Sequence, residues 1–279
     1  MTTAPLPSDH TLEVRGLALH YLDWGNPEAL PLVLVHGLTN SAAGWQRVAP
    51  SFAGDYHVVA LDQRGHGDSG WADPGAYDTD SYVADLAGFV DSLGFERFVL
   101  VGHSMGGHNS LAYTARHPER VRCAVVNDIP PALDRDPAAS LARFSDGQHR
   151  LLPNLEAWLE QERPTQPFTP EEILRFSGQT RLKAVEGGLI PRYDPNASIH
   201  WAPRDLWDEA RTISRPTLFI RGGRSTVLDA ETLQRMDMEI APARSVTLEK
   251  SGHNTFFDME SEFIAVVRDF VAAHAHAPA

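Results

Sequence analysis

Short apolar runs alternate with amphipathic stretches along the first half of the chain. Residues 80–94 place apolar side chains at spacings of three and four, which predicts an amphipathic helix that ends at Gly94. Residues 12–25 predict an opening hairpin that turns at Gly16, and residues 41–52 predict a short helix. Runs that are apolar throughout predict strands buried on both faces of a parallel sheet, and they cover 32–37, 57–62, 98–103 and 122–128.

This alternation breaks off in the middle of the chain and resumes near the end. The interrupting stretch is rich in proline and carries short helical segments, but no run typical of a buried strand. Repeated strand–helix units predict an α/β fold, a mainly parallel, twisted sheet with helices on both faces. We assign residues 1–129 and 213–279 to this α/β core and residues 130–212 to a helical cap inserted into it.

Composition narrows the classes of function. The 279 residues are 42% hydrophobic and 22% charged, as in ordinary globular proteins with a sizeable core. The formal net charge of −13 argues against nucleic acid or an anionic membrane as a partner. The single cysteine, Cys123, lies within an apolar run, so we expect a buried thiol and no internal disulfide.

The sequence shows no recognisable targeting, membrane-spanning or cofactor-binding motif. Residues 1–10 have neither the basic nor the apolar region of a signal peptide, and no apolar segment is long enough to span a bilayer. We therefore expect a cytoplasmic monomer or homodimer that acts on a small molecule. No metal-ligand cluster or phosphate-cradling loop is recognisable, so we predict no metal and no cofactor.

A candidate nucleophile, Ser104, follows the predicted strand 98–103 in the segment GHSMG. A G-x-S-x-G pattern alone is weak, but its mechanism requires a buried strand before the serine and a helix after it. Both are predicted here, because an alanine-rich segment follows and ends at Pro118. The alternative is that the serine only caps the helix.

A candidate general base, His253, follows the last predicted strand, 244–250. In parallel sheets, groups that bind ligands cluster at the carboxyl ends of the strands, which would bring His253 close to Ser104. The chain has 13 histidines, so position decides the choice. Of the others at strand ends, His103 adjoins Ser104 and points its side chain away from it.

The acid that orients the histidine has two candidates. Asp128 ends the predicted strand 122–128, beside the strand that carries Ser104. Asp229 directly precedes a helical segment and is typical of a helix N-cap, so we favour Asp128. An oxyanion needs two backbone N–H donors, and we expect these from Met105 and from Leu38, in the loop after strand 32–37.

With these residues in the order Ser–Asp–His, the sequence resembles the α/β-hydrolase family over nearly its whole length. The segments VLVHGL, ALDQRGHGDS, VGHSMGG, HPERV and SGH match family motifs in order and at the usual spacing. The resemblance implies a scaffold role for Asp62, Arg64 and His66. Most members carry the acid at the position of Ser225, whereas some subfamilies, small carboxylesterases among them, carry it after the sixth strand, where Asp128 lies.

The resemblance implies a serine hydrolase, with ester hydrolysis as the expected reaction. Hydrolysis of C–C, amide or lactone bonds, perhydrolysis, and a ligand receptor that retains the triad remain alternatives. The substrate depends on the cap, whose arginines at 143, 150, 163, 175 and 181 could hold a substrate carboxylate. Candidate pocket-lining aromatics of the cap, which packing of the cap onto the core would also explain, include Phe144, Trp158, Trp201 and Trp207. Trp45, just after the oxyanion loop, is a further candidate for binding.

Overall fold

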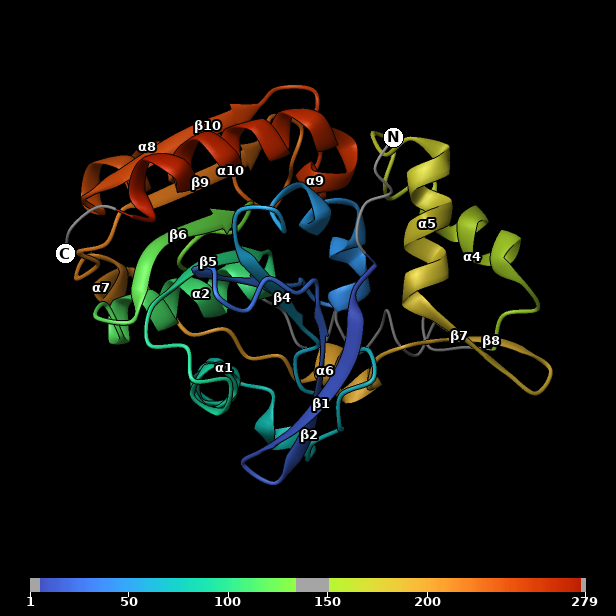
Figure 1. Cartoon of the computed structure of the whole chain (residues 1–279). Helices are drawn as coiled ribbons and strands as arrows, with labels where there is room; N and C mark the ends of the chain where they lie inside the picture. Colours follow the sequence, from blue (N-terminus) through green and yellow to red (C-terminus); the bar gives the residue numbers. More distant parts are fainter. Residues whose placement is uncertain (1–5, 134–150, 277–279) are drawn as a thin grey trace.

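The chain forms a mostly parallel, eight-stranded sheet flanked by helices, as predicted (Figure 1). The computed structural model describes residues 6–133 and 151–276. The strand order is β1-β2-β4-β3-β5-β6-β9-β10; the pairs β1–β2 and β2–β4 are antiparallel and the remaining pairs parallel. The strands are β1 (Ser8–Val14), β2 (Leu17–Asp23), β3 (Pro31–Val35), β4 (His57–Leu61), β5 (Phe98–His103), β6 (Val121–Asn127), β9 (Thr217–Gly222) and β10 (Ala243–Leu248).

Helices cover both faces of the sheet, and each face has its own apolar cluster. One cluster packs α1 and α2 against the sheet, and the other packs the short 3-10 helices η1 and η2 together with α9 and α10. The predicted helix over 41–52 is in fact the pair η1 and η2. The core helices are α1 (Thr79–Ser92), α2 (Met105–Arg116), α8 (Ala230–Glu239), α9 (Thr255–Asp258) and α10 (Glu260–His274), with η1 (Ala42–Arg47), η2 (Ala49–Ser51) and η3 (Pro74–Ala76).

The opening hairpin turns where the sequence predicted. Val14 pairs with Leu17, so only Arg15 and Gly16 lie in the turn. Both have positive φ, 52° and 78°, which is the backbone twist that two-residue hairpins favour. The thiol of Cys123 is buried between the sheet and its helices, and this burial raises its pKa to about 12.

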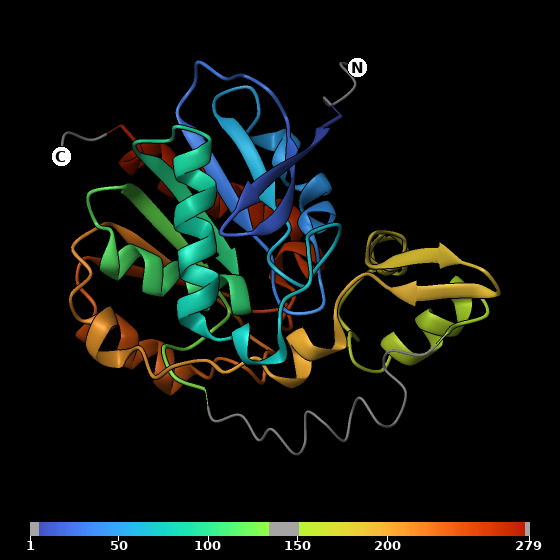
Figure 2. The same cartoon turned by 90° about the horizontal axis from the view of Figure 1, so that it is seen from below.

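The described part of the segment between β6 and β9 places α4, α5 and the β7–β8 hairpin to one side of the sheet (Figures 1 and 2). Its helices α4 and α5 share a small apolar cluster with Leu152 and Leu182. It also contains a β7–β8 hairpin, which the sequence did not predict because its strands are exposed or only partly buried at most positions and carry no buried apolar run. The elements are α4 (Leu155–Glu162), α5 (Glu171–Arg181), β7 (Leu182–Val185), β8 (Gly188–Pro191), α6 (Pro195–Ile199) and α7 (Trp207–Ala210).

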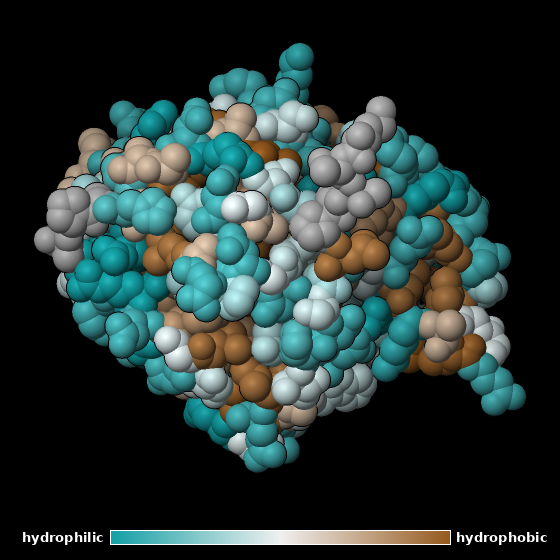
Figure 3. Space-filling view, viewed as in Figure 1, coloured by the Kyte–Doolittle hydropathy of each residue, from teal (hydrophilic) through white to brown (hydrophobic). Residues whose placement is uncertain are grey.

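The face shown in Figure 3 is largely hydrophilic, and apolar side chains reach it in separate patches. Among the residues that the structure describes, no helix is long and apolar enough to cross a bilayer.

Candidate active site

Three side chains far apart in the sequence form a continuous hydrogen-bonded chain. The Ser104 hydroxyl lies 2.9 Å from Nε2 of His253, and Nδ1 of the same imidazole lies 2.6 Å from Oδ2 of Asp128. A carboxylate can only accept, so Nδ1 carries the proton and Nε2 is free to accept from the serine. The structure thus brings together the three residues selected from the sequence, in the protonation order that base catalysis requires.

Ser104 sits on a strained turn between β5 and α2. Its backbone has φ 53° and ψ −122°, a conformation that a residue with a side chain rarely adopts. It occupies the N-cap position of α2, yet its side chain makes no capping hydrogen bond. The hydroxyl is directed at His253 instead, which is evidence against the alternative that this serine merely caps the helix.

The glycines on either side of Ser104 allow this turn. A Cβ at Gly102 would overlap the Gly106 carbonyl and the Ser110 hydroxyl, both in α2. A Cβ at Gly106 would overlap the carbonyls of Val35 and His36 at the end of β3. Helix α2 therefore starts in direct contact with β3 and β5, and only glycine leaves room for that approach.

Asp128 is fully buried at the end of β6, and donors surround its carboxylate. Oδ1 accepts from the Gly222 N–H at 2.9 Å, and Oδ2 accepts from the Ser225 hydroxyl at 2.5 Å as well as from His253. These contacts replace the water that a buried carboxylate loses. Asp229, the other candidate acid, instead accepts from the N–H of Thr232 at the start of α8, which is the capping role considered for it.

The loop that carries His253 is held by a second carboxyl group, that of the partly buried Asp258. Asp258 Oδ2 accepts from the Gly252 N–H at 2.7 Å and from the Ser251 hydroxyl at 3.1 Å. Its Oδ1 accepts from the hydroxyl of Thr169, in the cap segment, at 2.5 Å. Burial raises the pKa of the Asp258 carboxyl group. Contacts from both the core and the cap therefore fix the loop.

His103 also supports this loop, although the sequence analysis gave it no role. Its Nε2 donates to the backbone carbonyl of His253 at 3.0 Å, and the two rings lie 4.7 Å apart. Burial and the neighbouring His253 hold the pKa of His103 well below its usual value, so its ring is neutral. Its neighbour in the sequence, Ser104, contacts His253 through the ring, at Nε2.

The backbone groups expected to bind an oxyanion lie on two adjoining segments. Met105 is the first residue of α2, and Leu38 lies in the loop after β3. The two loops are close, because a Cβ at Gly37 would lie 2.9 Å from the Ser104 Cβ. Leu38 and Met105 also share one apolar cluster. The arrangement is compatible with two N–H donors beside the serine.

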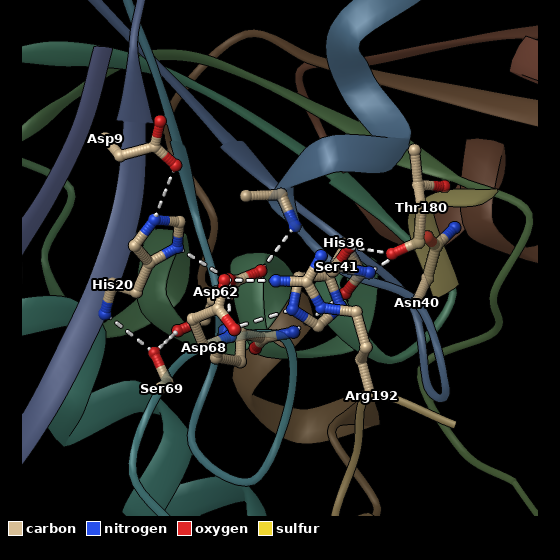
Figure 4. Close-up of polar contacts among 12 residues, drawn as sticks. Asp9, His20, His36, Asn40, Ser41, Asp62, Asp68, Ser69, Thr180 and Arg192 are labelled. Atoms are coloured by element: carbon tan, nitrogen blue, oxygen red, sulfur yellow. Dashed lines mark hydrogen bonds and ion pairs between the residues drawn. The ribbon is translucent and has the colours of Figure 1, made fainter. Parts of the chain in front are cut away.

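The DQRGHGDS segment forms a polar network around the buried carboxylate of Asp62 (Figure 4). Asp62 accepts from the backbone N–H groups of Ala42 and Asp68, at 2.6 and 3.0 Å, and lies 2.7 Å from Nδ1 of His20. His20 and the two aspartates could hold a metal ion by distance alone. However, Asp62 already accepts from these donors, and Asp68 forms an ion pair with Arg192. These contacts explain the cluster as part of the structural scaffold.

Two further members of this segment are also buried. Arg64 forms a two-pronged ion pair with Asp85, at 2.5 and 2.6 Å. Burial lowers the pKa of His66 to about 3, so its ring is neutral near neutral pH. Neither side chain takes part in the Ser104–His253–Asp128 chain.

Three of the described aromatic candidates pack against apolar neighbours within the core or the cap. Trp45 is 0% exposed and stacks on Phe256 at 4.6 Å, so its predicted role in binding is corrected to core packing. Trp158 is buried in the apolar cluster of the cap. Trp207 packs on the core and lies 3.7 Å below the guanidinium of Arg235.

Trp201 is placed differently, and Phe144 lies outside the described residues. Trp201 belongs to the apolar cluster that contains Met105, with Leu38 packed against it. Among the described candidates, Trp201 is therefore the tryptophan that shares an apolar cluster with the residues expected to bind the oxyanion.

The cap arginines lie outside the described residues or already have partners. Arg143 and Arg150 belong to the first group. Arg163 and Arg175 pair with Glu156 and Glu171 on the surface. Arg181 alone among the described cap candidates contacts the loop after β3.

Comparison with known proteins agrees with this architecture. The chain is 40% identical over 219 residues to a non-heme chloroperoxidase of Streptomyces lividans, which covers 74% of this chain and 78% of that protein. It is 30% identical over 274 residues to a 2-hydroxy-6-oxo-2,4-heptadienoate hydrolase of Pseudomonas putida, covering 91% and 92%. The crystal structure of an E-2-(acetamidomethylene)succinate hydrolase superposes with a TM-score of 0.87 at 23% identity, over 95% of this chain and 99% of that one.

A family model described as the alpha/beta hydrolase fold matches residues 31–259, which include every residue of the hydrogen-bonded chain. The protein therefore belongs to the alpha/beta hydrolase family of enzymes.

Proposed function

We propose that the protein is a serine hydrolase that cleaves a carboxylic ester through an acyl-enzyme on Ser104. The observation that carries the proposal is the unbroken Ser104–His253–Asp128 chain, with contacts of 2.9 and 2.6 Å. In this geometry, Nε2 of His253 takes the hydroxyl proton as Ser104 attacks the acyl carbon. Asp128 keeps the imidazole in the required tautomer and stabilises its charged form.

The reaction then proceeds in two steps, acylation of Ser104 and hydrolysis of the acyl-enzyme. The tetrahedral oxyanion accepts hydrogen bonds from the N–H groups of Leu38 and Met105. His253 returns its proton to the leaving alcohol, and the acyl group stays on Ser104. In the second step, His253 deprotonates a water molecule, which attacks the acyl carbon. The second tetrahedral intermediate then breaks the bond between the acyl carbon and Ser104 and releases the carboxylic acid, while His253 returns the proton to the Ser104 oxygen.

A substrate panel with matched variants tests this proposal. Purified protein is assayed with p-nitrophenyl esters of rising chain length, lactones and acidic amides. Turnover of esters by the wild type, lost in Ser104→Ala, is expected. Ser92→Ala, at the exposed end of α1, should leave turnover unchanged. Unchanged ester turnover in Ser104→Ala would refute the nucleophile, and a single slow turnover with strong ligand stabilisation would favour a receptor.

The relatives favour two other reactions of the same site. The identity to a chloroperoxidase supports perhydrolysis, in which hydrogen peroxide replaces water and the acyl-enzyme releases a peracid. Halide oxidation that requires peroxide, a carboxylic acid and Ser104 would support that reaction. The identity to a heptadienoate hydrolase supports C–C bond hydrolysis, which ring-cleavage products added to the panel would detect.

A further inference from the structure

The loop that carries Leu38 contains a residue in an unfavourable conformation. Thr39 has φ 63°, in the left-handed region that β-branched residues rarely adopt. Such strain persists only where surrounding contacts hold it. The contacts that hold Thr39 therefore also help to fix the direction of the preceding peptide groups, including the N–H of Leu38.

Two hydrogen bonds to Thr39 come from one side chain, 142 residues away. Arg181, the last residue of α5, donates from Nε to the Thr39 carbonyl at 2.9 Å and from Nη2 to the Thr39 hydroxyl at 2.6 Å. A third contact lies beside them, where the Ser41 hydroxyl donates to the Thr180 carbonyl at 3.4 Å (Figure 4). The end of α5 therefore contacts the loop at two points.

The cap holds the guanidinium of Arg181 in place. Its side chain is only 16% exposed, its charge lies 3.9 Å from a Glu162 carboxylate oxygen, and it lies 5.4 Å above the ring of Trp158. Two sides of the planar group are thus committed to Thr39 and Glu162. This leaves the group poorly placed for the two-pronged grip that an arginine uses on a substrate carboxylate.

We propose that Arg181 is a positioning residue that holds the oxyanion loop in its strained, donor-ready conformation. This inference rests on the proposed function, because it assigns the Leu38 N–H to the oxyanion. It also makes the cap part of the catalytic arrangement: a displacement of α5 would release Thr39 and misalign one of the two donors. The effect should fall on the transition state, where the oxyanion exists, more than on substrate binding.

The first test separates kcat from KM. Arg181→Met is assayed with an uncharged p-nitrophenyl ester beside Arg175→Met, a change in the same helix at a surface ion pair. Removing an oxyanion donor lowers kcat roughly 100- to 1000-fold, so a misaligned donor should cost about 10- to 100-fold. KM should change less than about threefold, and Arg175→Met should match the wild type.

A double-mutant cycle tests the strain itself. Glycine adopts the left-handed conformation freely, so a loop carrying Thr39→Gly depends less on the Arg181 contacts. The loss caused by Arg181→Met should therefore be several-fold smaller in the Thr39→Gly background than in the wild type. An equal loss in both backgrounds would overturn the proposal. A rise in KM confined to esters with a carboxylate on the acyl group would overturn it too, in favour of substrate binding.

A readout without substrate keeps this inference separate from the proposed function. Amide hydrogen exchange of the segment 36–41, followed by mass spectrometry, should rise in Arg181→Met and stay at the wild-type level in Arg175→Met. Unchanged exchange would overturn the positioning role even if no ester is turned over. Conversely, faster exchange in a protein without Ser104-dependent turnover would support the positioning role of Arg181 and contradict the proposed hydrolase activity.

Discussion

Replacing Asp128 by asparagine leaves the shape of the site intact and removes only the charge and one acceptor. In the native site, Oδ1 accepts from the Gly222 N–H, and Oδ2 accepts from both Ser225 and His253. An asparagine amide offers one acceptor where the carboxylate offers two. Whichever way the amide lies, its NH2 group faces a donor that the carboxylate had accepted, either the Gly222 N–H or Nδ1–H of His253.

The least disruptive arrangement keeps the amide oxygen on Gly222 and turns the NH2 group toward His253. The imidazole then shifts its proton to Nε2, and this tautomer cannot accept the proton of Ser104. In the well-studied serine protease triad the same change lowers kcat about 10⁴-fold. That loss corresponds to about 5 kcal/mol at the transition state, and we expect a similar value here.

The assay compares kcat for a p-nitrophenyl ester at pH 7 in Asp128→Asn and Asp229→Asn. The second variant makes the same chemical change at an exposed helix cap, where asparagine also caps well, so its kcat should stay within about twofold. Folding of both variants is checked by circular dichroism. A loss below about tenfold for Asp128→Asn, or the larger loss for Asp229→Asn, would refute the assignment of the acid.

Other predictions concern packing and charge. Asp85→Asn leaves the guanidinium of Arg64 buried without its partner, so urea denaturation should show a loss of about 3–5 kcal/mol, and a loss below 1 kcal/mol would contradict it. Trp45→Ala should cost about 3–5 kcal/mol, whereas Trp45→Phe should leave KM unchanged; a tenfold higher KM would restore a binding role. His66 has a pKa near 6.5 when unfolded and about 3 when folded, so its contribution to stability is complete above pH 6.5 and falls by up to about 1.4 kcal/mol per pH unit below that. Urea denaturation between pH 7 and 4.5 should therefore be less pH-dependent in His66→Gln, and an equal slope would contradict this.

The sequence was sufficient for the parts of the fold that have a strong local signal. Continuous apolar runs marked β3, β4, β5 and β6 because these strands are buried on both faces. The strand-ending positions of Ser104, Asp128 and His253 followed from that, since carboxyl ends of parallel strands share one edge. Asp229 could be set aside because capping residues precede helices in a recognisable way.

Other features depended on contacts between distant segments and left no local signal. The β7–β8 hairpin is exposed or only partly buried at most positions, so neither its apolar pattern nor its length marked it. The sequence alone does not distinguish a tryptophan that lines a pocket near the oxyanion loop from one that stacks in the core, as Trp45 does. The contacts of Ser225 with Asp128 and of Arg181 with Thr39 join residues about a hundred or more positions apart.

The most direct test of the account is to find where a substrate acyl group is held during turnover. The protein is mixed rapidly with p-nitrophenyl acetate, quenched in acid, and analysed by intact mass and by peptide mapping. We predict one acetyl group per chain, located on Ser104, that accumulates more strongly in Asp128→Asn if deacylation slows further than acylation. An acetyl group on another residue, or the same labelling in Ser104→Ala, would contradict the central claim.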